Sequence, residues 1–77
     1  MTTFETVRRI IARVTRSSEA DITPELALKD IKADSLHWLQ IVVGVEEALD
    51  IEIDFDRMRE MTTVGDFVSY VDGCRKQ

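Results

Sequence analysis

Apolar residues recur along the chain at intervals of three and four, a spacing that predicts helices. The first helix is expected to begin at Thr2, because Thr2 and Glu5 have the spacing of a capping box. One face then collects the apolar residues Phe4, Val7, Ile10, Ile11 and Val14. Arginines occupy the other face. A basic amphipathic helix can lie on a membrane, but the same pattern is typical of a helix in a bundle, and we favour the bundle.

The stretch from Leu36 to Leu49 is the most apolar of the chain and predicts a central helix. Asp34 is a favoured N-cap, so Ser35 is the expected first helical residue, at an exposed corner. The polar residues of this helix share one face: His37, Gln40, Gly44 and Glu47. Because this strip is narrow, other elements are expected to cover most of the helix circumference.

Residues 17–33 lack helical periodicity and contain Pro24, which indicates a long loop pinned to the core by its apolar residues. A short helical turn from Pro24 to Leu28 is one possibility. Residues 50–54 alternate like a strand but have no partner strand, so we interpret them as a linker that buries Ile51 and Ile53.

Two further helices follow this linker. Asp54 or Asp56 is expected to cap a short helix that runs through Met61. A last helix is expected to start at Thr63 and to end at Gly73. The sequence therefore predicts a single all-α domain over residues 1–77, a bundle of three main helices plus one short helix, with a long loop between the first two.

Charge and cysteine content limit the possible environments and partners. The net charge is −5, and residues 33–56 hold seven acids and no lysine or arginine. This acidic region argues against nucleic acid as a partner and favours proteins with basic patches. The single cysteine fits a reducing compartment, and no apolar run is long enough for stable membrane insertion. We expect a cytoplasmic monomer.

Ser35 is the residue with the clearest chemical potential. A catalytic serine needs a base and an oxyanion hole, yet the only histidine, His37, lies two residues along the same helix and points roughly opposite. We therefore expect no catalytic residue. The acids of residues 50–56 lack the glycine and terminal glutamate of a calcium loop, so no metal site is expected. A phosphate ester on Ser35 would suit a helix N-terminus, where the helix dipole favours negative charge.

Three segments together carry a resemblance to a known family. Ala33-Asp34-Ser35-Leu36, the segment from Glu46 to Ile53 and the segment from Thr62 to Asp66 resemble, at these spacings, the acyl carrier proteins. The resemblance covers nearly the whole chain. It implies a non-catalytic carrier in which Ser35 receives 4′-phosphopantetheine from coenzyme A, with Asp34 and Leu36 beside it. The thiol of this arm would hold acyl or aminoacyl cargo as a thioester and present it to partner enzymes.

The resemblance also implies partners and further site residues. A phosphopantetheinyl transferase would modify the carrier, an acyl or aminoacyl ligase would load it, and synthases or acyltransferases with basic patches would receive the cargo. The residues that would dock to such enzymes are His37, Gln40, Gly44, Glu47 and Arg57. The residues that would line a cargo cavity are Trp38, Ile53, Met58 and Met61. Trp38 would narrow that cavity and favour short, polar or unusual cargo.

Departures from the family pattern suggest a specialised carrier with its own partners in a lipid, polyketide or related pathway. His37 and Gln40 stand where fatty-acid carriers usually have acids, and Arg57 and Arg59 stand on the short helix where acids are common. Two alternatives stay open. One is an acidic helical interaction module that is never modified, although such a module has no need of Ser35. The other is a membrane-surface adaptor that uses the basic first helix.

Overall fold

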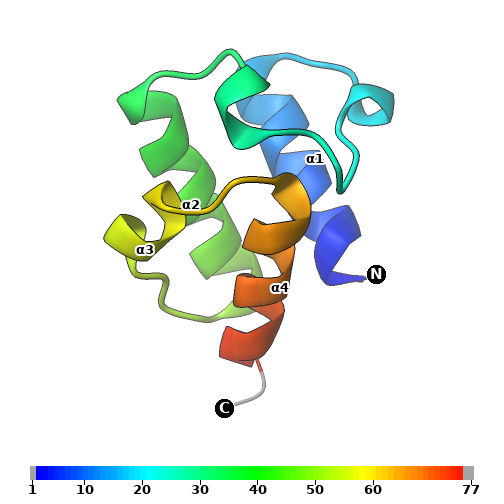
Figure 1. Cartoon of the computed structure of the whole chain (residues 1–77). Coiled ribbons are helices and arrows are strands. Elements are labelled where there is room, and N and C mark those ends of the chain that lie inside the picture. Colours follow the sequence, from blue (N-terminus) through cyan, green and yellow to red (C-terminus); the bar gives the residue numbers. More distant parts are fainter. Residues whose placement is uncertain (1, 76–77) are drawn as a thin grey trace.

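The computed structural model describes residues 2–75. Three long helices, α1, α2 and α4, form the body of the molecule, and the short α3 lies beside α2 (Figure 1). In chain order the elements are α1 (Thr3–Thr15), the 3-10 helices η1 (Glu19–Asp21) and η2 (Leu28–Asp30), α2 (Ser35–Leu49), α3 (Phe55–Arg59) and α4 (Val64–Arg75). The all-α prediction and the long connection between the first two main helices are confirmed.

The helix starts follow the local sequence closely. The Thr2 hydroxyl accepts a hydrogen bond from the backbone N–H of Glu5, and the Glu5 carboxylate accepts one from the N–H of Thr2, which completes the predicted capping box. Thr63 and Asp66 form the same reciprocal pair before α4. Asp54 caps α3, accepting from Asp56. Such caps satisfy backbone donors that a helix N-terminus otherwise leaves unpaired.

The core lies where α1, α2 and α4 meet, closed by residues from the loop and from α3. Its buried apolar residues are Val7, Ile10, Ile11, Ala12, Ile22, Leu28, Ile31, Ile41, Val42, Val45, Ile53, Met58, Val64, Phe67 and Val71. The apolar stripe of α1 supplies Val7, Ile10 and Ile11, and its Phe4 and Val14 are partly buried against the core. Because that stripe packs against the rest of the protein, it is not available to insert into a membrane surface, and the bundle interpretation of α1 holds. Among the described residues, no helix is both long and apolar enough to cross a bilayer.

The loop between α1 and α2 is held in place by backbone hydrogen bonds to the segment before α4. Leu28 donates to the Thr62 carbonyl at 2.8 Å, and Val64 donates to the Leu26 carbonyl at 2.9 Å. These bonds flank an antiparallel bridge between Ala27 and Thr63. The loop is therefore well packed, as expected. The suggested helical turn near Pro24 is present as a single turn at Pro24 and Glu25, closed by a hydrogen bond from the Leu26 N–H to the Thr23 carbonyl at 3.1 Å. It does not continue to Leu28, because the backbone of the next residues pairs with the segment before α4.

Two predicted helix ends are also wrong. The short helix α3 ends at Arg59, two residues before Met61. The last helix passes through Gly73 and continues to Arg75. Gly73 does not adopt the positive φ of a helix-ending glycine, so the α-helical hydrogen bonds continue beyond it.

Gly65 and Gly73 lie in the same helix but in opposite surroundings. A Cβ on Gly65 would lie 3.0 Å from the Pro24 carbonyl oxygen, which accepts the Gly65 N–H at 2.8 Å. A Cβ on Gly73 would meet nothing within 4 Å.

We expect Gly65→Ala to lower the free energy of unfolding by about 1–3 kcal/mol, because the loop backbone must move away from α4. Gly73→Ala should raise it by roughly 0.5–1 kcal/mol, since alanine is the better helix former. Urea unfolding followed by circular dichroism measures both. Equal effects of the two substitutions would contradict the close approach of the loop to Gly65.

Candidate functional site

The site is built around the start of α2. The Asp34 carboxylate accepts a hydrogen bond from the backbone N–H of His37 at 2.9 Å, and the His37 Nδ1 accepts one from the N–H of Asp34 at 3.4 Å. The bond from the His37 N–H lowers the pKa of the Asp34 carboxyl, so this group stays charged at neutral pH. These two hydrogen bonds hold the backbone at the first turn of α2, which begins with the next residue, Ser35.

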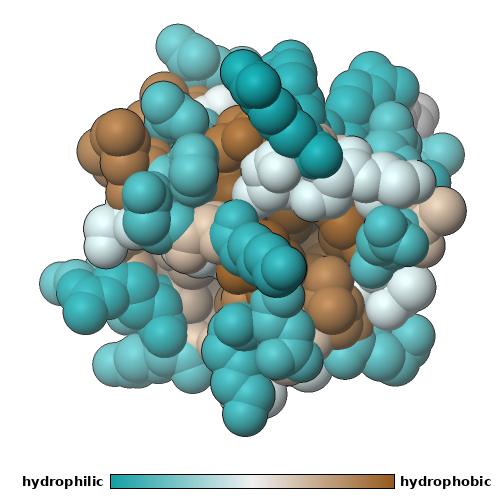
Figure 2. Space-filling view, turned by 90° about the horizontal axis from the view of Figure 1, so that it is seen from above, coloured by the Kyte–Doolittle hydropathy of each residue, from teal (hydrophilic) through white to brown (hydrophobic). Residues whose placement is uncertain are grey.

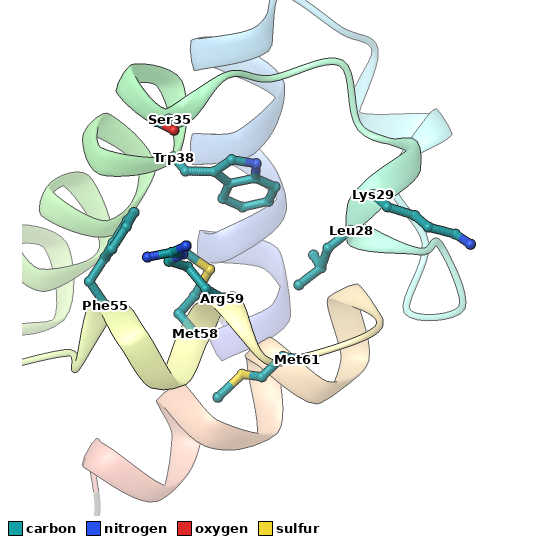
Figure 3. Close-up of a pocket in the computed structure, with 8 residues that line it drawn as sticks. All are labelled: Leu28, Lys29, Ser35, Trp38, Phe55, Met58, Arg59 and Met61. Carbon is teal, nitrogen blue, oxygen red and sulfur yellow. The ribbon is translucent and has the colours of Figure 1, made fainter.

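Ser35 is the first residue of α2 and is exposed. Its side chain lies at one end of a cavity of 580 Å³. The cavity lies between α2, α3 and the η2 part of the loop, and its lining residues are Leu28, Lys29, Ser35, Trp38, Phe55, Met58, Arg59 and Met61 (Figure 3). Viewed from the end of the molecule that carries the loop, hydrophobic surface gathers in a hollow rimmed by hydrophilic side chains (Figure 2).

Three of the four predicted cavity residues line this space: Trp38, Met58 and Met61. Trp38 extends from α2 toward the loop, beside Ser35, as Figure 3 shows. Ile53 is instead buried in the core and is not among the lining residues of this cavity. Sequence reasoning missed the lining residues Leu28, Lys29, Phe55 and Arg59. The three-residue spacing of Phe55 and Met58 could have indicated a shared face of α3, whereas nothing local in the loop points to Leu28.

The exposed face of α2 differs from the predicted one. Leu36, Leu39 and Val43 are 61%, 49% and 41% exposed. Other elements therefore do not cover most of the α2 circumference, and that expectation is wrong. The three apolar residues lie with Gln40 and Glu47 on one exposed face, at positions three and four apart.

The other residues expected to dock to partners are less exposed or belong to α3. Gly44 faces α1, since a Cβ on it would lie 3.2 Å from Ile10 Cγ2. His37 is partly occupied by its contact with Asp34, at 3.3 Å. Arg57 lies on α3, where its guanidinium stacks 5.7 Å from the centre of the Tyr70 ring. Of the predicted docking residues on α2, Gln40 and Glu47 are exposed, whereas His37 and Gly44 are only partly exposed.

Among the described residues, neither a catalytic base nor a set of metal ligands is positioned to act with Ser35. The only histidine of the sequence, His37, interacts with the Asp34 N–H and carboxylate rather than with the Ser35 hydroxyl. In the part of the chain that the structure describes, no group of three or more histidine, cysteine or acidic side chains could hold a metal ion. The site offers an exposed hydroxyl at the start of a 15-residue helix, beside a cavity lined by apolar side chains together with Lys29 and Arg59.

Comparison with known proteins assigns this arrangement to a family. The sequence matches the family described as "Phosphopantetheine attachment site" over residues 5–71. It is 36% identical over 72 residues to the acyl carrier protein of Streptococcus pneumoniae strain R6, covering 94% of this chain and 95% of that protein. It is 34% identical over 73 residues to the acyl carrier protein of Helicobacter pylori strain J99, covering 94% of each. The chain belongs to the acyl carrier protein family.

Membership settles the class of function and the prosthetic group. Acyl carrier proteins are non-catalytic carriers modified with 4′-phosphopantetheine, and they work with synthases and transferases. The resemblance to this family that the sequence segments carry is therefore confirmed. The site fits the group: an exposed serine hydroxyl can be esterified without disturbing the core, and the adjoining cavity has room and apolar walls for part of the arm or its cargo.

Proposed function

We propose that Ser35 is the residue that carries 4′-phosphopantetheine and that this carrier presents acyl or aminoacyl cargo to enzymes of a specialised lipid, polyketide or related pathway. The observation that carries the proposal is the position of Ser35, which is exposed on the first turn of α2 and lines the 580 Å³ cavity. The phosphodiester would lie at a helix N-terminus, where negative charge is favoured. The arm itself supplies the thiol that holds the cargo as a thioester.

Asp34 supports this role by capping α2, of which Ser35 is the first residue. Leu36 is the most exposed of the large apolar residues and lies next to the attachment point. We propose that Asp34 and Leu36 help the phosphopantetheinyl transferase to recognise the site. The cargo cavity would be the one that Trp38, Met58 and Met61 line; Ile53 would support its wall from the core.

Partner enzymes would dock on the exposed face of α2 formed by Leu36, Leu39, Gln40, Val43 and Glu47. An exposed apolar group beside acidic residues suits an enzyme surface that combines an apolar patch with basic side chains. His37, on the same helix, and Arg57, on α3, would adjust the choice of partner, whereas Gly44 would act by letting α1 approach α2.

The positive side chains of α3 support the proposal of a specialised pathway. Arg57 and Arg59 give α3 two positive side chains beside an otherwise acidic region, where a basic docking patch would be repelled. Loading would come from an acyl or aminoacyl ligase, and the place of work would be the cytoplasm, with the carrier acting as a monomeric single domain over residues 1–77.

The test is the intact mass of the wild-type protein after incubation with coenzyme A and a broad-specificity phosphopantetheinyl transferase. We expect a gain of one phosphopantetheine group per chain. If several transferases give no gain although circular dichroism shows a folded protein, the alternative of an unmodified acidic interaction module replaces the carrier.

A further inference from the structure

Arg59 is the one arginine among the cavity-lining residues and shares that lining with Ser35 and Trp38. It is the last residue of α3. In Figure 3 its guanidinium reaches from α3 toward the space between Phe55 and Trp38, on the side of Ser35. The Lys29 side chain, also part of the lining, points away from that space (Figure 3). Arg59 therefore offers a positive charge to the cavity itself.

The Arg59 guanidinium forms only a weak ion pair within the protein. Its nearest acid is Asp56, at 3.7 Å, and the two side chains are 68% and 88% exposed. An ion pair this exposed is weak and exchanges easily for a better-placed anion. Arg57, two residues before Arg59, stacks on the Tyr70 ring instead and does not line the cavity.

We propose that Arg59 binds an anionic oxygen of the prosthetic arm and so holds the arm against the cavity. The oxygen belongs either to the phosphodiester or to a carboxylate at the end of a short acyl cargo. A guanidinium presents planar, paired N–H donors that match both groups. This inference rests on the proposed attachment to Ser35, and binding of the cargo carboxylate would give the carrier a preference for anionic cargo.

The direct test follows the Nε–H signal of Arg59 by NMR in ¹⁵N-labelled protein. Four states are compared: the unmodified protein, the phosphopantetheine form with a free thiol, and that form loaded with malonyl or with butyryl cargo. A shift in all three modified states, equal in size, identifies the phosphodiester as the bound anion. A shift confined to, or clearly larger in, the malonyl form identifies the cargo carboxylate. No shift in any modified state overturns the proposal.

Variants give a second readout, with Trp38, the only tryptophan in the sequence, as the reporter. We expect attachment or loading of the arm to change Trp38 fluorescence in the wild type. Arg59→Gln should make the bound position of the arm about tenfold less populated, as expected for a lost charge-assisted hydrogen bond, and so remove most of that change. Arg9→Gln, which removes the same charge from an exposed position of α1 that does not line the cavity, should keep it. Equal behaviour of the two variants would contradict the role of Arg59.

Intact mass separates this inference from the proposed function. Both variants should gain the phosphopantetheine group as the wild type does, because neither changes Ser35. Failure of all three proteins to gain mass would refute the carrier proposal. Full modification with no difference between the variants would refute the role of Arg59 alone.

Discussion

Ser35→Ala is expected to abolish attachment of phosphopantetheine completely while leaving the fold intact. The substitution removes the hydroxyl oxygen that the phosphate would esterify, and no neighbouring side chain replaces it. Ser35 is exposed, and the side chain that caps α2 belongs to Asp34, so stability should change little. Intact mass after incubation with coenzyme A and transferase measures the first effect, and thermal unfolding measures the second.

Ser69→Ala is the matched control, because Ser69 is also an exposed helical serine but lies in α4, away from the cavity. It should be modified to the same extent as the wild type. A mass gain that survives Ser35→Ala, or one that disappears with Ser69→Ala, would place the attachment elsewhere and with it the centre of the site.

Phe67→Ala is expected to cause the largest loss of stability of any single substitution considered. Phe67 is completely buried and is the largest of the fully buried side chains. Truncating a buried phenylalanine costs roughly 3–5 kcal/mol, through lost burial and the cavity left behind. Small domains have unfolding free energies near the low end of about 5–15 kcal/mol. The variant should therefore be partly unfolded at room temperature, which urea titration followed by circular dichroism would detect.

Phe4→Ala is the comparison for this prediction. Phe4 is only half-buried, and the Arg8 guanidinium lies 5.0 Å from its ring centre. Because part of the Phe4 side chain is already exposed to solvent, Phe4→Ala should lower the free energy of unfolding clearly less than Phe67→Ala does. An equal cost for the two substitutions would mean that the junction of α1, α2 and α4 does not hold the centre of the core.

Local sequence was sufficient wherever a feature depends on neighbouring residues. The starts of α1, α2, α3 and α4 were predictable because a cap is formed by side chains within three residues of the backbone groups they satisfy. The exposed position of Ser35 follows from its place directly after the Asp34 cap. The loop character of residues 17–33 followed from Pro24 and the missing periodicity, although the hydrogen bonds that pin it did not.

Contacts between distant segments decided the rest. The periodicity of α2 does not say which of its apolar residues are covered, and only the packing of α1, α3 and α4 leaves Leu36, Leu39 and Val43 outside. The sequence pattern placed Gly44 in the polar strip of α2, but in the structure its lack of a side chain lets Ile10 of α1 pack close to α2. The cavity needs α2, α3 and a loop residue, Leu28, brought together from separate parts of the chain.

The caps, the helices and the reactive serine are thus properties of short stretches of this chain, because hydrogen bonds to nearby backbone groups act over one helical turn. The exposed face of α2, the shape of the cavity and the position of Arg59 at its edge come from the tertiary structure. They depend on which surfaces are removed from water when the helices pack, and burial is a property of the whole fold.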